Sequence, residues 1–86
     1  MSMLEIQARM VAAIQRLAHR HAGEVIVLVS HSDPLKLAIA YHIGMPLDTF
    51  QRLDISPASI SELVFTSFHV RLARLNDTAH VANCVL

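Results

Sequence analysis

The chain has 86 residues, of which 53% are hydrophobic and 16% are charged, and its mean hydropathy is +0.45. Seven basic side chains balance seven acidic ones, and this neutral charge, with few aromatic residues, argues against nucleic-acid binding. No apolar run reaches the roughly 18 residues that a membrane-spanning helix needs, and the first ten residues lack the pattern of a signal peptide.

The hydrophobic content is high for so short a chain. A chain of this length forms at most one domain and buries only about 60–65% of its unfolded surface. The sequence therefore predicts that apolar surface is covered by a partner, or that the chain is part of a larger domain. Cys84 is the single cysteine, which leaves no internal disulfide and suits a reducing cytoplasm.

An amphipathic helix is predicted over residues 2–22. Its apolar positions recur at the spacing of one helix face, and they are Ile6, Met10, Ala13, Ile14 and Leu17. Basic residues gather in the last turn, and Gly23 follows as the expected C-cap.

A strand followed at once by a second helix is predicted next. Residues 24–30 contain an apolar run without alternation, which is typical of a strand buried on both faces in a parallel sheet. Asp33 is a favourable N-cap and Pro34 a favourable first helical residue. The second helix is therefore expected from residue 34 to about residue 43, ending at Gly44.

The rest of the chain is predicted to form shorter elements. These are a short helix within residues 45–53, a brief strand at 53–55, and a C-terminal hairpin of residues 59–66 and 68–75. The two hairpin segments alternate apolar and polar residues around a tight turn at Thr66 and Ser67. The chain after Asn76 is expected to be irregular. This order of elements, helix-strand-helix and then a short strand and a hairpin, indicates the α/β class.

His31 lies where the predicted strand gives way to the second helix. In open α/β sheets, ligands bind at the carboxyl ends of strands, beside helix N-termini. Free N–H groups and the positive end of the helix dipole form an anion site there. The His31 imidazole and the backbone N–H of Ser32 are therefore predicted to bind a phosphoryl group. The alternative is a turn or capping histidine with a backbone partner.

Other chemical interpretations of the polar residues are disfavoured. Residues 30–33, Ser-His-Ser-Asp, are adjacent, whereas a hydrolytic triad needs side chains that converge from separate segments. The interpretation of Asp33 as a general acid competes with that of a helix cap. The remaining histidines show no ligand spacing such as HExxH. The sequence therefore predicts neither a metal site nor a cofactor.

Several motifs follow one another in a characteristic order. An apolar strand, a Ser-His pair, a helix, a Gly-Met-Pro-Leu turn and the segment ISPASIS occur within residues 25–61. This segment resembles the C-terminal part of the histidine phosphatase superfamily, the phosphoglycerate mutase-like enzymes. The opening SMLEIQARM and the ending VRLARLNDTAHV are also similar, so the resemblance covers about residues 2–81. It implies a partial phosphoglycerate mutase-like fold, with residues 1–86 forming a single incomplete domain.

The resemblance also implies a division of catalytic roles. In such enzymes a histidine of an Arg-His-Gly loop becomes phosphorylated, a second histidine and two arginines hold the phosphoryl oxygens, and a glutamate protonates the leaving oxygen. His31 matches the second histidine, which implies a catalytic role in holding phosphate or a phosphomonoester, and Ser32 stands where glycine is usual. Residues 1–86 contain no Arg-His-Gly, and Met1 stands where the glutamate is expected. We therefore expect the isolated chain to be inactive.

Three interpretations of the chain remain open. It is a fragment of a phosphoryl-transfer enzyme, a non-catalytic remnant that binds phosphate weakly or only associates with itself, or a reading frame shortened at its N-terminus. In-frame Arg-His-Gly and Gly-Glu codons upstream of Met1 would support the third interpretation.

In the complete fold that the resemblance implies, the nucleophile-bearing strand lies next to residues 24–30. Because an uncovered apolar edge pairs readily with another chain, we expect a homodimer or larger oligomer that covers residues 24–30.

Overall fold

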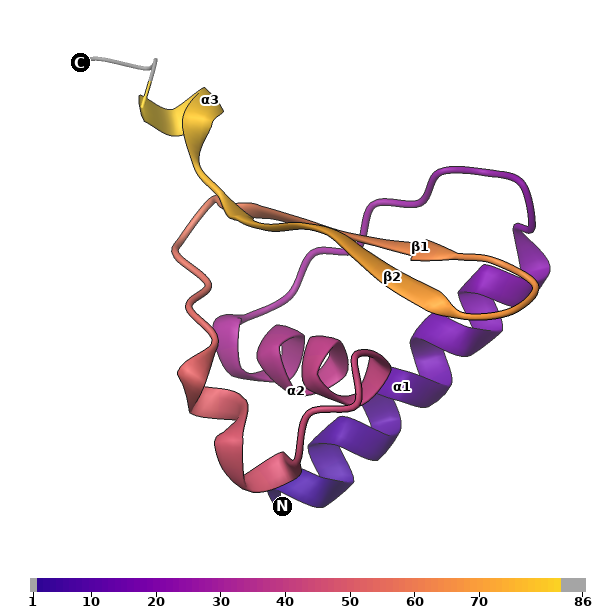
Figure 1. The fold of residues 1–86 in the computed structure, drawn as a ribbon, viewed down its shortest axis with the longest axis horizontal. Coiled ribbons are helices and arrows are strands. Elements are labelled where there is room, and N and C mark those ends of the chain that lie inside the picture. The colour runs from indigo at the N-terminus through magenta and orange to yellow at the C-terminus, as the bar shows by residue number, and fades with distance from the viewer. Residues whose placement is uncertain (1, 83–86) are drawn as a thin grey trace.

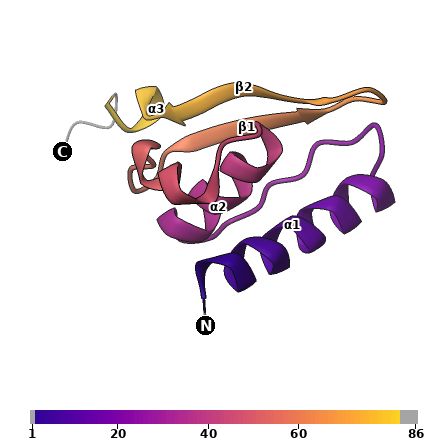
Figure 2. The same cartoon turned by 60° about the horizontal axis from the view of Figure 1, so that its bottom comes forward.

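In the computed structural model, which describes residues 2–82, the chain folds into helices and a single hairpin (Figure 1). The elements are α1 (Met3–Arg20), α2 (Ser32–His42), the 3-10 helix η1 (Leu47–Arg52), β1 (Ile60–Phe65), β2 (Val70–Asp77) and α3 (Ala79–Ala82). Figure 2 shows the hairpin on one side, α2 in the middle and α1 on the other side. Helices combined with a two-stranded antiparallel sheet confirm the predicted α/β class.

Helix α1 has well-formed ends close to the predicted ones. The Ser2 hydroxyl accepts a hydrogen bond from the Glu5 backbone N–H at 3.1 Å, which satisfies one of the donors that a helix start leaves unpaired. The helix ends at Arg20, and its C-cap is His21 rather than the predicted Gly23. Gly23 instead has φ +81° in the following turn, a conformation that suits glycine because it has no Cβ.

The buried core is built on α2, which contacts α1, η1 and β2. Its cluster consists of Leu37, Ile39, Ala40, Phe50 and Leu53. The buried side chain of Gln7 joins α1 to this core, because its amide Nε2 donates to the Leu37 carbonyl at 2.9 Å. That bond satisfies a polar group which would otherwise be costly to bury.

The predicted strand of residues 24–30 does not join a sheet. The segment is an open connection between α1 and α2 (Figure 1), and no backbone–backbone hydrogen bond among the described residues involves residues 25–30. Val25, Val27 and Val29 are 95%, 83% and 89% exposed. The prediction of a strand buried on both faces is therefore wrong for this chain, because no strand within residues 2–82 pairs with the segment.

The predicted C-terminal hairpin is confirmed. β1 and β2 pair antiparallel, with Leu63 opposite Leu72. The connecting loop covers residues 66–69 and is longer than the predicted two-residue turn. Thr66 closes it, since its backbone N–H and its hydroxyl both donate to the His69 carbonyl at 2.9 Å.

Two short elements differ from the predictions. Residues 53–55 connect η1 to β1 without pairing as a strand, and the Ile55 carbonyl instead accepts a hydrogen bond from a side chain of α2. The chain after Asn76 is not irregular, because β2 extends to Asp77 and α3 follows. The Asp77 carboxylate accepts a bond from the Ala79 N–H at 3.0 Å, an Asx-type turn before α3 that the sequence prediction missed.

Two further expectations concern the ends and the membrane. Cys84, interpreted from the sequence as a sign of a reducing compartment, lies outside the described residues. Among residues 2–82, no helix combines the length and the apolar character that crossing a bilayer requires.

Candidate functional site

His31 is the N-cap of α2, directly after residues 25–30. Its backbone is extended, with φ −86° and ψ 165°, and its carbonyl accepts the first helical bond from the Leu35 N–H at 3.2 Å. The His31 side chain makes no capping hydrogen bond. The alternative interpretation, in which the His31 ring caps the helix, is therefore wrong. Within residues 2–82 the exposed imidazole has no hydrogen-bond partner.

Two backbone amides follow this imidazole in the chain. Ser32 and Asp33 are the first two residues of α2, and their N–H groups have no partner among the described residues. Pro34 has no N–H to contribute. Because the aligned peptide dipoles leave partial positive charge at this end of the helix, the start of α2 is electrostatically suited to an anion.

Helix α2 begins two residues earlier than predicted. The sequence predicts Asp33 as the N-cap and Pro34 as the first helical residue, whereas the helix begins at Ser32. Proline is tolerated throughout the first turn, where N–H groups have no helical acceptor, so Pro34 does not fix the boundary. The Asp33 carboxylate therefore lies within the first turn, where its charge partly offsets the attraction of the helix end for an anion.

The Ser32 side chain is used by the fold. Its partly buried hydroxyl donates to the Ile55 carbonyl at 3.2 Å and so joins the start of α2 to the connection between η1 and β1. Of the two polar groups that Ser32 can direct at a ligand, the backbone N–H is the one that lacks a partner in the described part of the chain.

Replacing Ser32 with alanine separates these two roles. We expect Ser32→Ala to lower the free energy of unfolding by about 0.5–1.5 kcal/mol, as for one lost hydrogen bond, and to leave phosphate affinity unchanged. Urea unfolding followed by circular dichroism measures the first effect, and a phosphate titration measures the second. Ser67→Ala, in the exposed hairpin loop, is the matched control and should change stability by less than about 0.5 kcal/mol. A tenfold loss of phosphate affinity in Ser32→Ala would contradict this assignment.

A shallow hollow of about 270 Å³ lies beside the start of α2. It is lined by Ile6, Arg9, Met10, Ser30 and Pro34. Arg9 of α1 therefore shares this hollow with Ser30 and Pro34, which lie on either side of residues 31–33 in the chain. The sequence pattern could not show this, because helical periodicity assigns Arg9 only to the polar side of α1 and says nothing of what that side faces.

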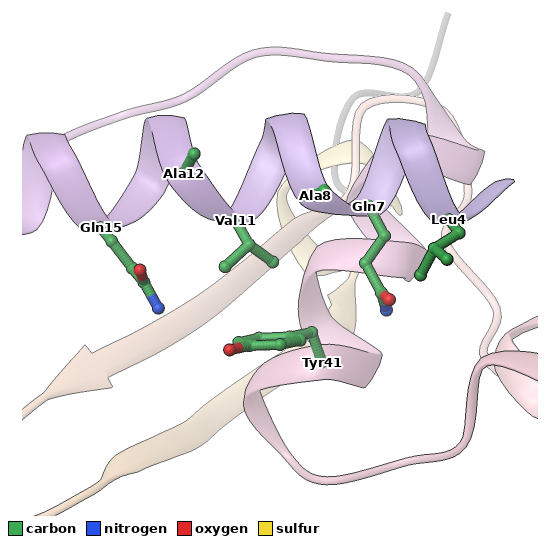
Figure 3. Close-up of a pocket in the computed structure, with 7 residues that line it drawn as sticks. All are labelled: Leu4, Gln7, Ala8, Val11, Ala12, Gln15 and Tyr41. Carbon is green, nitrogen blue, oxygen red and sulfur yellow. The ribbon is translucent and has the colours of Figure 1, made fainter. Parts of the chain in front are cut away.

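A second hollow, of about 320 Å³, lies between α1 and Tyr41 of α2 (Figure 3). Its lining residues are Leu4, Gln7, Ala8, Val11, Ala12, Gln15 and Tyr41. Tyr41 belongs to the last turn of α2, at the opposite end of the helix from His31. Apart from the Tyr41 phenol the lining contains no titratable side chain, so this hollow offers no acid, base or nucleophile for phosphoryl chemistry.

The other histidines are distributed over the fold. His21 Nδ1 lies 3.2 Å from a carboxylate oxygen of Glu24. His42 Nδ1 hydrogen-bonds to the Ala38 carbonyl at 2.8 Å, and its ring packs edge-on against Phe65. Within residues 2–82 no three His, Cys, Asp or Glu side chains come together as a possible metal site.

Comparison with known proteins identifies the family. The family model described as histidine phosphatase superfamily (branch 1) matches residues 1–78. The chain belongs to the histidine phosphatase superfamily.

Two solved structures resemble the chain. A mutant phosphoserine phosphatase from Entamoeba histolytica, in complex with phosphoserine, superposes with a TM-score of 0.85 at 22% identity, over 94% of this chain and 41% of that one.

The second solved structure is YhfR of Bacillus stearothermophilus. It superposes with a TM-score of 0.87 at 25% identity, over 92% of this chain and 40% of YhfR. The histidine phosphatase chain described here thus spans about two-fifths of either structure. No curated protein matches the chain. These matches confirm the predicted family and the partial phosphoglycerate mutase-like fold, and the superfamily binds phosphorylated substrates.

Proposed function

We propose that this chain is the C-terminal part of a phosphatase or phosphomutase of the histidine phosphatase type, and that it retains one wall of the phosphate pocket. The His31 imidazole and the N–H groups of Ser32 and Asp33 donate hydrogen bonds to the oxygens of phosphate or a phosphomonoester. The observation that carries this proposal is the exposed His31 ring at the N-cap of α2, next in the chain to two amides without partners among residues 2–82.

Charge and geometry set the expected strength of this site. Hydrogen bonds from the His31 ring and the two amides to the charged oxygens of phosphate are charge-assisted and stronger than neutral ones, and the dipole of α2 adds to them. Against this, the His31 ring is exposed and the Asp33 carboxylate lies in the same turn. We therefore expect millimolar affinity, about 4 kcal/mol of binding free energy.

The same proposal assigns the remaining chemistry to residues outside positions 1–86. The family resemblance implies a phosphorylated histidine in an Arg-His-Gly loop, and these 86 residues contain no such motif. We propose accordingly that residues 1–86 form one incomplete domain. Its ligand is phosphate or a phosphomonoester, and it does not bind nucleic acid. The single cysteine suits a cytoplasmic enzyme.

A second candidate function is a non-catalytic module that associates with itself. The exposed side chains of Val25, Val27 and Val29 favour it, because an isolated chain rarely leaves such a segment open to water. This candidate and weak phosphate binding are compatible with each other.

Phosphate binding is tested by NMR titration of the 86-residue chain with inorganic phosphate. The imidazole signals of His31 and the amide signals of Ser32 and Asp33 should shift together, with one dissociation constant in the millimolar range. His31→Ala should weaken binding by tenfold or more, because it removes the side-chain donor and leaves the amides.

The matched control is His69→Ala, which removes an exposed histidine on the hairpin loop and should not alter the affinity. Sodium chloride at equal ionic strength separates phosphate binding from general screening. Unmoved His31 signals at high millimolar phosphate, or equal losses in the two variants, would refute the ligand role of His31.

A further inference from the structure

Residues 25–29, in the connection between α1 and α2 (Figure 1), are uncharged and apolar, and their backbone edges are open. Val25, Val27 and Val29 are 83–95% exposed, whereas Ile26 and Leu28 between them are 40% and 41% exposed. This alternation has the period of a β-strand with one outward face. Backbone–backbone hydrogen bonds within residues 2–82 involve none of these five residues. Such an edge is a template for pairing with another chain.

We propose that two copies of this chain pair through this segment as antiparallel strands, with Val27 on the two-fold axis. In this register Val25 of one copy lies opposite Val29 of the partner subunit, and Ile26 lies opposite Leu28 of the partner subunit. The proposal deepens the second candidate function, self-association of the 86-residue chain, and rests on that candidate. It does not depend on phosphate binding.

The sequence around Val27 is self-complementary, as a two-fold interface requires. The run V-I-V-L-V has the same order of apolar classes in both directions, so every cross-strand pair joins two branched aliphatic side chains, which stabilises sheets. At each end of the run, the register places Glu24 opposite Ser30 of the partner subunit. A carboxylate therefore meets a hydroxyl, and no like charges oppose each other.

The pattern of exposure selects this register over its neighbours. Pairing centred on a residue places the outward valines of both copies on one face of the new sheet. If the pairing shifted by one residue, the outward valines of one copy would lie beside Ile26 and Leu28 of the partner subunit. The rest of each chain would then lie on opposite faces of the new sheet. Among the registers centred on a residue, only the one centred on Val27 pairs all five apolar residues with one another.

The oligomeric state is measured first, by size-exclusion chromatography with light scattering and by sedimentation at micromolar concentration. The 86-residue chain should have twice its 9.5 kDa mass. Val27→Lys should weaken dimerisation by tenfold or more, because it places two lysines directly opposite each other. Since Val27 is 83% exposed, the variant should keep the circular dichroism spectrum of the parent chain.

The matched control for this substitution is Leu4→Lys. Leu4 is another exposed aliphatic residue, 62% exposed, and it lines the hollow between α1 and α2 (Figure 3). Leu4→Lys should leave the dimer intact. If Leu4→Lys dissociates the dimer and Val27→Lys does not, the two copies meet through that hollow and the proposal is wrong.

Disulfide trapping tests the register. In a Cys84→Ser background, Val27→Cys should cross-link under mild oxidation, because opposed residues of antiparallel strands have Cα atoms about 4.5–5.5 Å apart, within the range for a disulfide. Val25→Cys alone should not cross-link, since four residues, roughly 13 Å, separate the two copies of position 25. Mixing Val25→Cys with Val29→Cys chains should restore the cross-link.

Two results would overturn the proposal. One is a well-folded monomer for the unmodified chain at micromolar concentration. The other is cross-linking of Val25→Cys alone as fast as that of Val27→Cys, which would indicate a different register or non-specific association. Neither result would bear on phosphate binding, which is followed through His31 in the monomer or the dimer alike.

Discussion

The 86-residue chain is expected to hydrolyse a generic phosphomonoester such as p-nitrophenyl phosphate no faster than buffer does. Enzymes accelerate such reactions by ~10⁶-fold or more, and covalent catalysis of this kind needs a nucleophile positioned for attack on phosphorus. Residues 1–86 contain no Arg-His-Gly, and the proposed role of His31 is to hold phosphoryl oxygens. A pocket wall without a nucleophile or a proton donor leaves the barrier almost unchanged. Release of p-nitrophenol over hours at high protein concentration measures this.

The His31→Ala and His69→Ala variants make this result interpretable. Hydrolysis that is well above buffer, that disappears in His31→Ala and that persists in His69→Ala would contradict the expectation and assign turnover to the 86 residues themselves. Activity that is equal in all three proteins would come from a contaminating phosphatase. Upstream DNA that encodes in-frame Arg-His-Gly and Gly-Glu would supply the missing groups, and a chain extended to include them should then be active.

Local patterns in the sequence predicted most of the helices and the hairpin. The helical spacing of Ile6, Met10 and Leu17 is sufficient for α1, and alternation around Thr66 is sufficient for the hairpin, because both signals act over a few residues. The helix-start signals around Asp33 gave α2 but misplaced its first residue, since a proline fits several positions of a first turn.

The failure at residues 25–29 has a different cause. An apolar run without alternation indicates the environment of a strand in a covered parallel sheet, and the sequence prediction assumed that covering. Within residues 2–82 no strand pairs with this run, so its outward valines are exposed. The apolar run thus indicates a strand that needs neighbouring strands and a cover on both faces. Residues 2–82 cover one face of it in part and supply no neighbouring strand.

The candidate site was located from the sequence through His31, because a motif and its position before a helix are local features. The bond from the Ser32 hydroxyl to the Ile55 carbonyl joins residues 23 positions apart, and no local pattern encodes such a pair. The position of Arg9 in the hollow beside Ser30 likewise depends on how α1 packs against the start of α2. The sequence therefore predicts the candidate residues at the start of α2, whereas it does not predict the contacts that residues distant in the chain make with them.

Leu37→Ala is expected to cause the largest loss of stability among single substitutions in the core. Leu37 is fully buried on α2, inside the cluster that also contains Phe50 and Leu53. Truncating a buried leucine removes its transfer free energy and leaves a cavity, which together lower the free energy of unfolding by about 2–5 kcal/mol. For a chain of 86 residues, whose whole stability is about 4–13 kcal/mol by size alone, this is a large share.

Leu4→Ala is the matched control, since it makes the same chemical change at a position that is 62% exposed. Its effect should stay within about 0.5 kcal/mol. Urea unfolding followed by circular dichroism gives both values, provided that all proteins are compared at one concentration, because dimerisation adds to apparent stability by mass action. Equal losses in Leu37→Ala and Leu4→Ala would mean that the core is not centred on α2. A large loss in Leu37→Ala alone would show that α2, which also presents His31, is held in place by packing within these 86 residues.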